Sequence, residues 1–335
     1  MQSIHQDHPF FKNDRLWIAN CDAISFLKQL PDHSVDLILV DPPFGLQEKH
    51  FDQNHYQRDE QFVLSGYQEA PDTMTYEDWV STWISDFDRV LKPNGSLLII
   101  SGWTNEAAIQ YAIAKTKQFR LINHLIWNFN FGVATKTKFV TSHYHILYYC
   151  KTKGKPYFNK YAYHNESHLD QNGRSLMYQD LQDVIKINKQ YAPGQIKNVN
   201  SLPLALVEKL IKHTTKINDV VCDLFSGNWT TQKAALNLKR IAWGCEINPH
   251  SYQHHYQSLI NHKSPYSDDL IALSGYQQAP EYANQSQPID VNLRQTIISY
   301  YQKLDPQLTK KQKIATTQLQ FKRGYWAIKR IIEQK

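Results

Sequence analysis

Apolar residues recur along this chain of 335 residues in two patterns, which predict strands and helices. Val35–Val40 is a short and almost wholly apolar run, typical of a strand buried on both faces of a parallel sheet. Ser96–Ile100 predicts a second strand. Between these strands, four apolar side chains recur at helical spacing and predict one helix: Trp79, Trp83, Phe87 and Val90. Pro93–Gly95 should end this helix.

A second alternating region runs from Pro203 to about Ile260. Here we expect two strands, Asp219–Leu224 and Ile241–Cys245, and three helices, which begin at Pro203, Thr230 and Pro249. Tyr144–Tyr149 is also strand-like. Strands that alternate with helices predict an α/β fold with a doubly wound, mostly parallel sheet. We place this domain at residues 1–262.

Two segments do not fit the alternating pattern. Residues 151–200 are polar, rich in Tyr and Asn, and irregular, so we expect an inserted recognition lobe and no core element. Residues 263–335 read as a polar linker followed by a basic extension. An amphipathic helix is expected there from Leu319 onward, because Tyr325, Ile328 and Ile332 share a face. That face would dock on the body of the protein or on a second subunit.

Charge is unevenly distributed along the chain. The net charge is +6, yet residues 107–165 hold nine Lys and Arg and no Asp or Glu, and the last 35 residues hold nine basic and two acidic residues. Such segregation favours a polyanionic partner, although two ordinary solvated basic surfaces explain it equally well. The candidate DNA contacts are Lys136, Lys138, Lys151, Lys153, Lys155, Lys322 and Arg323.

The cysteines and the apolar runs indicate the compartment. Four cysteines show neither a CxxC pair nor zinc spacing, which favours reduced, buried thiols. Residues 1–11 lack an apolar signal core, and no apolar run approaches the length of a membrane span. We therefore expect a cytoplasmic protein that does not contact a membrane and that needs no metal ion.

The tetrapeptide Asp41-Pro42-Pro43-Phe44 directly follows the strand Val35–Val40. Ligands of open α/β sheets bind beyond the carboxyl ends of the strands, and the two prolines end the strand and stiffen the turn there. A carboxylate and a carbonyl that accept both N–H bonds of an arylamine favour a nucleophilic geometry at its nitrogen. The aromatic ring could stack on the base. All four residues are candidate catalytic residues, and a plain proline turn is the structural alternative.

A second strand–turn–helix carries candidate cofactor contacts. Gly227 permits a tight turn before the helix expected from Thr230. Glu246 stands nineteen residues later, at the end of the next strand, where an acid suits hydrogen bonding to ribose hydroxyls. Taken alone, one glycine and one acid fit an ordinary turn better than a cofactor site. The candidates are Asp223, Phe225, Ser226, Gly227, Asn228, Thr230, Glu246 and Ile247.

The order of these motifs resembles the beta-class amino-methyltransferases, bacterial DNA methyltransferases in which an Asp-Pro-Pro-aromatic motif precedes a Phe-x-Gly-x-Gly motif. Here Asp41–Phe44 precedes Phe225–Gly227. Further segments that are similar to motifs of this family are Asn20–Ala23, Val90–Ser96, Ser142–Leu147 and Asn198–Pro203. Trp229 departs from the pattern, because it stands where the family usually has its second glycine. A ring of this size is expected to reshape the floor of the cofactor site.

The resemblance implies a Rossmann-like methyltransferase fold and S-adenosylmethionine as cofactor. It adds Asp22 and Ala23 as contacts near the cofactor adenine and Asn200 and Ser201 at its methionine end, and it places Asp41 beside both cofactor and target. The implied substrate is a base flipped out of double-stranded DNA. Asp in place of Ser at position 41 favours the N6 amine of adenine.

Two alternatives remain open from the sequence. One is a related reaction, the methylation of N4 of cytosine or of RNA. The other is a nucleic-acid-binding protein without catalytic activity that keeps the fold, at which Trp229 hints. The sequence also leaves open a cognate restriction endonuclease as partner, and a homodimer.

Overall fold

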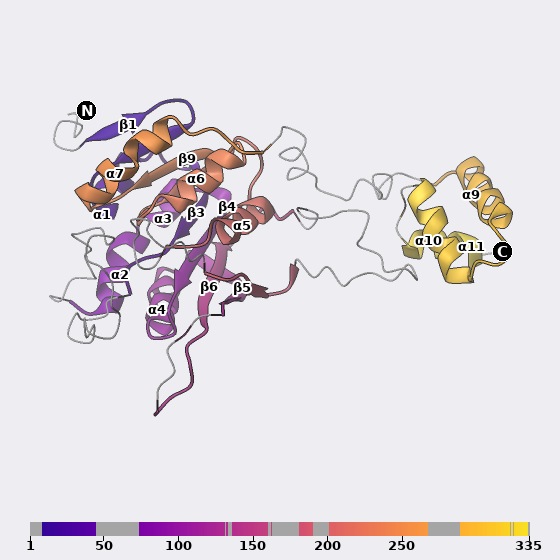
Figure 1. The fold of residues 1–335 in the computed structure, drawn as a ribbon, viewed down its shortest axis with the longest axis horizontal. Helices are drawn as coiled ribbons and strands as arrows, with labels where there is room; N and C mark the ends of the chain where they lie inside the picture. Colours follow the sequence, from indigo (N-terminus) through magenta and orange to yellow (C-terminus); the bar gives the residue numbers. More distant parts are fainter. Residues whose placement is uncertain are drawn as a thin grey trace. The chain divides into compact units, whose positions relative to one another are not determined.

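The computed structural model describes residues 9–44, 74–130, 132, 136–159, 162, 181–189, 201–266, 289–321, 323 and 325–333. The chain forms two compact units, of which the first comprises residues 1–158 and 183–271 and the second residues 159–182 and 272–335. Figure 1 shows both units. The segment 151–200, expected as one lobe, is divided between the two units.

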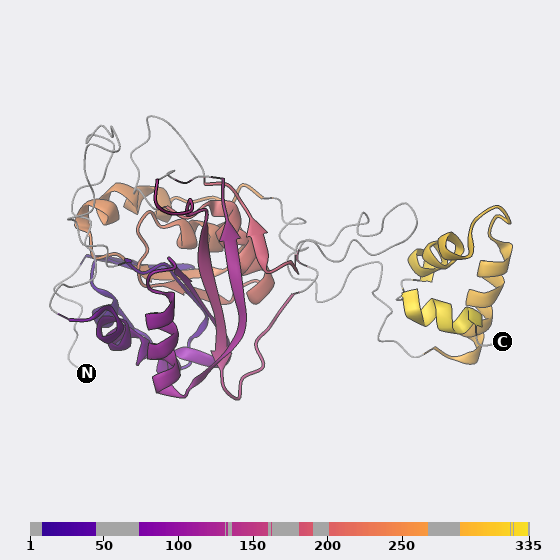
Figure 2. The same cartoon turned by 90° about the horizontal axis from the view of Figure 1, so that it is seen from below.

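Unit 1 is built on a mixed sheet of nine strands. In spatial order they are β1 (Phe10–Lys12), β2 (Leu16–Ala19), β9 (Ile241–Cys245), β8 (Val220–Asp223), β3 (Val35–Val40), β4 (Leu91–Ser101), β6 (His143–Lys151), β5 (Phe119–Asn128) and β7 (Val184–Lys186). The strands from β2 to β4 in this order are parallel, whereas β1 and β6 are antiparallel to their neighbours β2 and β4. The long pair β5 and β6 is antiparallel as well (Figure 2).

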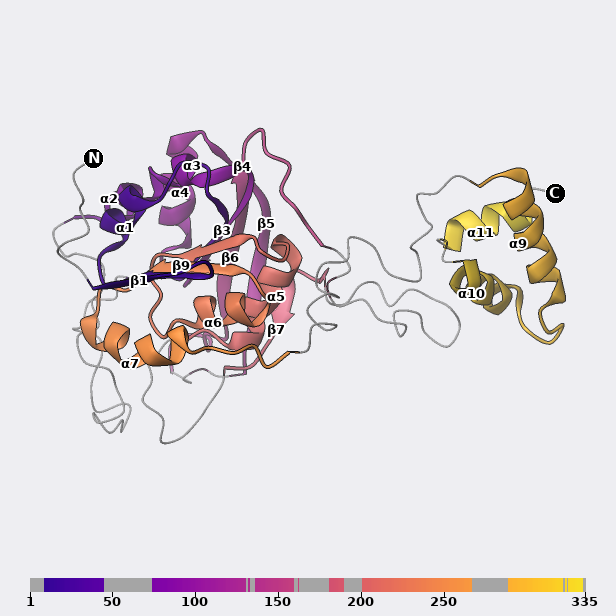
Figure 3. The ribbon, with the colours of Figure 1, turned by 90° about the horizontal axis from the view of Figure 1, so that it is seen from above.

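Helices cover both faces of this sheet (Figure 3). One face carries α1 (Ala23–Gln29), α2 (Tyr76–Ile84), α3 (Phe87–Val90) and α4 (Glu106–Thr116). The other face carries α5 (Leu204–Thr214), α6 (Thr230–Asn237) and α7 (Pro249–Ile260). Each face has its own apolar core, because side chains alternate between the two faces along every strand. Leu147 of β6 belongs to the first core and its neighbour Ile146 to the second.

Side-chain caps begin several of these helices. Asp22 accepts a hydrogen bond from the Ser25 N–H at the start of α1, and Thr75 accepts one from the Asp78 N–H at the start of α2. Asn248 does the same for α7, where Pro249 occupies the first turn and needs no N–H partner. The doubly wound α/β fold predicted from the sequence is confirmed.

The helix predicted over Trp79–Val90 is two helices, since Ser85 and Asp86 separate α2 from α3. Strand β4 then begins at Leu91, ahead of Pro93, and not at Ser96 as expected. Residues Pro93 and Asn94 are exposed. Proline is tolerated near the start of a strand, where its missing N–H leaves no central ladder bond unmade.

The prediction that residues 151–200 contain no core element is wrong. Strand β7 closes one edge of the sheet by parallel pairing with β5, and its Ile185 is buried. Three residues with one apolar side chain facing the core give no detectable strand pattern. The neighbouring β5 was missed too, because its polar and apolar residues follow no clean alternation.

In unit 2 the described helices are α9 (Val291–Lys303), α10 (Lys310–Phe321) and α11 (Tyr325–Glu333). They share an apolar core formed by Ile297, Ile314, Ile328 and Ile331. The single helix expected from Leu319 onward is therefore wrong, since α10 ends at Phe321 and α11 begins at Tyr325. The apolar face of α11 packs on α9 and α10 within its own unit.

Of the polar linker 263–288, only residues 263–266 fall within the described residues. Among the helices that the structure describes, none is long and apolar enough to cross a membrane.

Candidate functional site

The candidate site lies at the ends of four neighbouring strands. We call this place the site edge and define it as the carboxyl ends of β2, β9, β8 and β3. These parallel strands are neighbours, so their following turns lie side by side. Three predicted segments meet there: Asp41–Phe44 after β3, Phe225–Gly227 after β8 and Glu246 after β9. Asn20, after β2, donates to the carbonyls of Glu246 and Ile247 at 2.7 and 3.2 Å, which ties the outermost turn to the others.

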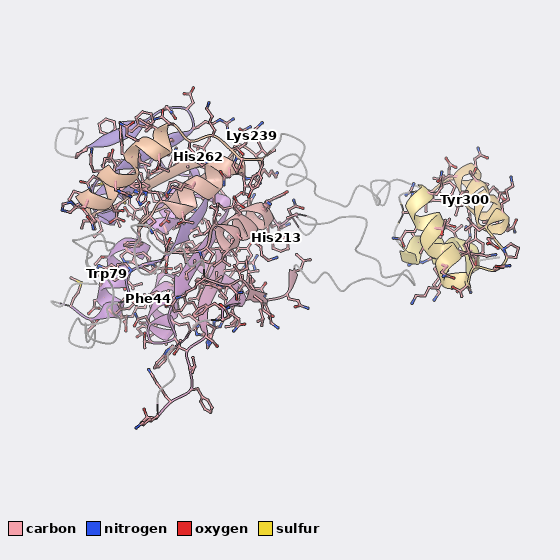
Figure 4. All side chains as sticks on the ribbon, in the orientation of Figure 1. Phe44, Trp79, His213, Lys239, His262 and Tyr300 are labelled. Carbon is pink, nitrogen blue, oxygen red and sulfur yellow. The ribbon has the colours of Figure 1, made fainter. Side chains whose placement is uncertain are left out.

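The turn Asp41–Phe44 is held by contacts from two helices. The Tyr76 hydroxyl of α2 donates to the Pro43 carbonyl at 3.0 Å, and the Asn105 amide before α4 donates to the Phe44 carbonyl. Phe44 lies near α2, which carries Trp79 (Figure 4). Tyr76 and Asn105 were missed from the sequence, because they lie 33 and 61 positions away from their partners and leave no local signal.

Asp41 has an enclosed oxygen that is unpaired within the described residues. Its Oδ1 atom is buried and accepts no hydrogen bond from any of them, although the residue as a whole is partly exposed. A buried acceptor without a partner costs about 1–3 kcal/mol. Such a cost is tolerable where a ligand supplies the missing donor. Asp41 therefore has the geometry expected of a group that binds an N–H of a substrate.

Four aromatic side chains in mutual contact form what we call the aromatic wall: Phe44, Tyr144, Phe129 and Trp127. The Phe44 ring meets the Tyr144 ring of β6 edge to face, with centroids 5.2 Å apart. Tyr144 contacts Phe129 and Trp127 in the same manner, at 5.2 and 5.6 Å. Burial, and then the charge of Asp41, raise the pKa of Tyr144 to about 12, so it stays a neutral phenol at physiological pH.

The turn after β8 is tightly built. Gly227 has a positive φ of 48°, which favours glycine. Gly244 of β9 lies so close to the turn that an added Cβ would clash with Gln232 Nε2 and would lie 2.6 Å from the Asp223 carbonyl oxygen. Ser226 is buried, and its hydroxyl is engaged by both the Asp223 carbonyl and the Gln232 amide. Ser226, predicted as a cofactor contact, thus shapes the turn from within.

Trp229 occupies the cap position of α6 with a left-handed φ of 60°. This conformation explains why glycine suits the position, since a non-glycine residue there is strained. The indole is fully buried in the core beneath α5–α7, where its ring centroid lies 6.0 Å from that of Tyr252. The indole is therefore part of this core, and the expectation that it reshapes the floor of the cofactor site stays a prediction.

Glu246 links β9 to the glycine turn. Its Oε2 accepts the Gly227 N–H at 2.7 Å, and its Oε1 accepts the Asn248 N–H at 2.8 Å. Burial raises the pKa of Glu246, although these two bonds oppose the shift. Each oxygen has a second lone pair, so the carboxylate can accept further hydrogen bonds from a ligand. Ile247 beside it is 48% exposed, a large apolar surface at the same edge.

The charge of Asp223 affects the pKa of Asp41, and the charge of Glu246 affects the pKa of Asp223. Asp223 Oδ2 accepts the Thr231 hydroxyl at 2.6 Å and its Oδ1 the Phe225 N–H at 3.0 Å. Burial, assisted by the Glu246 charge, raises the pKa of Asp223 to about 7 against these two bonds. Burial, and then the charge of Asp223, raise the pKa of Asp41 well above its ordinary value. These three residues are the site carboxylates.

Three acidic side chains at the site edge suit a cationic ligand. Buried acids with raised pKa values recover stability when a positive ligand neutralises them. A ligand with a sulfonium centre and an ammonium group, together with hydroxyls that donate to Glu246, matches this set of carboxylate acceptors. The residues present therefore fit S-adenosylmethionine.

The remaining predicted cofactor contacts fall in several places. Asp22 is half-buried. Burial raises the pKa of its carboxyl, but the hydrogen bonds from Ser25 outweigh this effect and lower the pKa, so Asp22 stays ionised. Ala23, Asn228 and Thr230 are half-buried at the starts of α1 and α6, and Phe225 packs against Trp79 and Trp83 of α2. Ser201 precedes α5. Asn200 lies outside the described residues.

The predicted DNA contacts divide by exposure. Four are exposed: Lys136, Lys138, Lys153 and Lys155. Lys151 is engaged within unit 1, where its ammonium contacts the Asp88 carbonyl at 2.5 Å and carboxylate at 3.2 Å. Arg323 is only 3% exposed in unit 2, so its guanidinium does not face solvent. Lys322 lies outside the described residues.

The fold and the site edge define a class of DNA-modifying enzymes. Residues 35–257 match the family model described as DNA methylase, of N6/N4 type, and the chain belongs to this family. It is 29% identical over 265 residues to the type II methyltransferase M.BamHI of Bacillus amyloliquefaciens, covering 73% of this chain and 57% of that one. It is 28% identical over 253 residues to the DNA adenine methyltransferase YhdJ of Escherichia coli (strain K12), covering 71% and 80%.

The chain spans 57% and 64% of the lengths of M.BamHI and M.HinfI, the latter from Haemophilus influenzae. Among solved structures, the PvuII DNA methyltransferase (cytosine-N4-specific) superposes with a TM-score of 0.56 at 17% identity, over 78% of this chain and 91% of that one. A putative DNA modification methylase from Thermus thermophilus, TTHA0409, complexed with S-adenosyl-L-methionine, gives 0.50 at 21% identity, over 76% and 99%. These likenesses show the shared fold.

Proposed function

We propose that this chain is a site-specific DNA methyltransferase of the beta class that methylates the exocyclic N6 amine of adenine in double-stranded DNA. The observation that carries the proposal is the buried, unpaired Oδ1 of Asp41, next to the glycine turn at the site edge. An amine donor and a cofactor would meet where these two turns adjoin.

S-adenosylmethionine is the methyl donor, and it supplies an electrophilic methyl group on a cationic sulfur. We assign the binding of its ribose hydroxyls to Glu246, with Asp22 and Ile247 beside the adenine. The backbone of the turn Phe225–Gly227 would lie against it, and Ser201 and Asn200 would hold its methionine end. Asp223 contributes negative charge from below the turn.

For the target amine, Asp41 Oδ1 would accept one N–H bond and a carbonyl of the tetrapeptide the other. The Pro43 and Phe44 carbonyls each already use one of their two acceptor positions, on Tyr76 and Asn105, so we assign the second bond to the Pro42 carbonyl. Such bonds direct the nitrogen lone pair toward the methyl group. Proximity and alignment supply most of the acceleration in a direct displacement. Phe44 would stack on the flipped base.

Adenine is proposed as the target because position 41 is an aspartate and because one relative is named a DNA adenine methyltransferase. Duplex DNA is the proposed partner. The exposed Lys136, Lys138, Lys153 and Lys155 are the proposed phosphate contacts, which position the duplex without reading its sequence.

Modification-sensitive sequencing tests this function directly. Plasmid DNA would be isolated from a methylation-free host that expresses the chain, with Asp41→Ala as the matched control. N6-methyladenine in one recurring sequence, absent with Asp41→Ala, is the expected result. N4-methylcytosine would replace the adenine assignment, and unmodified DNA from a folded, cofactor-binding protein would overturn the proposal.

A further inference from the structure

Lys189 lies beside the candidate site, on the segment that follows β7. The Trp127 indole donates to the Ile187 carbonyl at 2.7 Å, and the Ile187 N–H donates to the Asn128 carbonyl at 3.1 Å. These bonds fix the chain against the end of β5, two residues before Lys189. The lysine is therefore delivered to a defined place, although its segment has no regular structure.

The Lys189 ammonium rests on the aromatic wall. It lies 4.4 Å from the Phe129 ring centroid, 4.6 Å from that of Tyr144 and 5.9 Å from that of Trp127. It also donates a long hydrogen bond of 3.4 Å to the Tyr144 hydroxyl. Cation–π attraction to these three rings favours this position of the ammonium.

Described titratable groups near Asp41 come from three elements, and contacts link Lys189 to its turn, because the ammonium lies 3.4 Å from the Tyr144 hydroxyl and the Tyr144 ring meets that of Phe44 at 5.2 Å. Asp223 comes from β8, Tyr144 from β6 and Lys189 from the segment after β7. Asp223 is like-charged and Tyr144 is neutral, whereas Lys189 alone of the three brings a positive charge. It opposes the effect that burial and Asp223 have on the pKa of Asp41.

We propose that Lys189 is a positioning residue for methyl transfer, which holds the Tyr144 ring beside the target base and places a positive charge next to the turn that carries Asp41. This inference rests on the proposed function, because Asp41 accepts an N–H bond well only as a carboxylate. A lysine that merely packs on aromatic rings would stabilise the fold without changing the pH range of the reaction. The two roles therefore differ in their effect on the pH profile.

The experiment measures single-turnover methylation from about pH 5.5 to 9, with saturating cofactor and DNA. Lys189→Met removes the charge and keeps the length of the side chain, and Lys189→Arg keeps the charge. Lys12→Met is the matched control, because the Lys12 ammonium also lies on a ring, 3.6 Å from the Trp17 centroid. Lys12 belongs to β1, the outer strand at the other end of the strand order from β7, which precedes Lys189.

We expect the acid limb of Lys189→Met to move up by about one pH unit, a typical effect of losing a nearby opposite charge. Its rate would fall roughly tenfold on that limb and stay within about threefold of the wild type at high pH. Lys189→Arg and Lys12→Met should keep the wild-type limb. The proposal is overturned by a Lys189→Met rate that is unchanged, or lowered equally at all pH values, or by an arginine variant that behaves like the methionine one.

A readout without DNA separates this inference from the proposed function. The Asp41 carboxyl can be titrated by 13C NMR in aspartate-labelled protein, with Asp41→Asn to assign the signal. A higher midpoint in Lys189→Met supports the charge coupling even if the wild type methylates no DNA, which would sink the proposed function alone. Equal midpoints in the two proteins would refute the role of Lys189.

Discussion

Replacement of Glu246 by glutamine tests the cofactor half of the site edge. The two side chains have the same length, but the amide nitrogen of glutamine cannot accept a hydrogen bond. In the wild type both oxygens accept backbone N–H bonds, from Gly227 at 2.7 Å and from Asn248 at 2.8 Å. Glu246→Gln therefore loses one of these bonds and the negative charge.

The magnitude follows from these bonds. One backbone N–H left unpaired should lower the free energy of unfolding by about 1–3 kcal/mol. Loss of a charged hydrogen bond to a cofactor hydroxyl should cost a further 1.5–3 kcal/mol, roughly, of binding free energy. The dissociation constant of S-adenosylmethionine should thus rise about 10- to 150-fold.

Isothermal titration calorimetry of the cofactor, without DNA, measures the binding term, and urea unfolding measures the stability term. Glu77→Gln is the matched control, because Glu77 pairs with Lys115 between α2 and α4 and should not affect binding. If Glu246→Gln loses stability yet binds the cofactor within about twofold of the wild type, Glu246 only fixes the turn and the reasoning fails.

Three further predictions follow from the site and from unit 2. Asp41→Ala should abolish methyl transfer in a radiolabel assay while the cofactor dissociation constant stays within about threefold; substantial turnover would refute the role of Asp41. Burial raises the pKa of Asp223 to about 7, above its ordinary 3.8, so the folded state holds a proton that the unfolded state lacks between these values, and stability falls as pH rises through this window. In urea unfolding at a series of pH values, Asp223→Asn should flatten this dependence by up to about 1.4 kcal/mol per pH unit, and an unchanged slope would contradict it. Deletion of the chain beyond Pro288 should weaken DNA binding and reduce the log–log salt slope by roughly two to four, as expected for two to four lost phosphate contacts; a folded truncation with the same slope would make unit 2 purely structural.

Sequence patterns predicted the elements that are continuous and buried. Val35–Val40 and Ile241–Cys245 coincide with β3 and β9, since strands covered on both faces are apolar throughout. β7 escaped detection because its place in the sheet depends on pairing with β5, a tertiary contact. Likewise, α11 turns its apolar face to α9 and α10, a partnership that helical periodicity alone does not reveal.

The motifs of the candidate site could be predicted from the sequence, whereas the residues from other elements that contact these motifs could not. Asp41 and Gly227 carry local signals, a proline turn and a glycine turn, and the sheet brings those turns together. Tyr76 and Lys189 reach the site only through the fold. Trp229 has a left-handed backbone conformation, which a tryptophan in the sequence does not predict.

The pairing of β3 with β8 also determines when the site edge is completed during synthesis. Asp36 Oδ2 of β3 accepts the Val220 N–H of β8 across 184 positions of the chain. A nascent chain that has completed β3 therefore carries Asp41 long before the cofactor turn exists. At typical elongation rates of about 5–20 residues per second, the ribosome needs about 10–40 s to supply β8. Completion of the site edge is thus a late event of biosynthesis, reached when the last parallel strands enter the sheet.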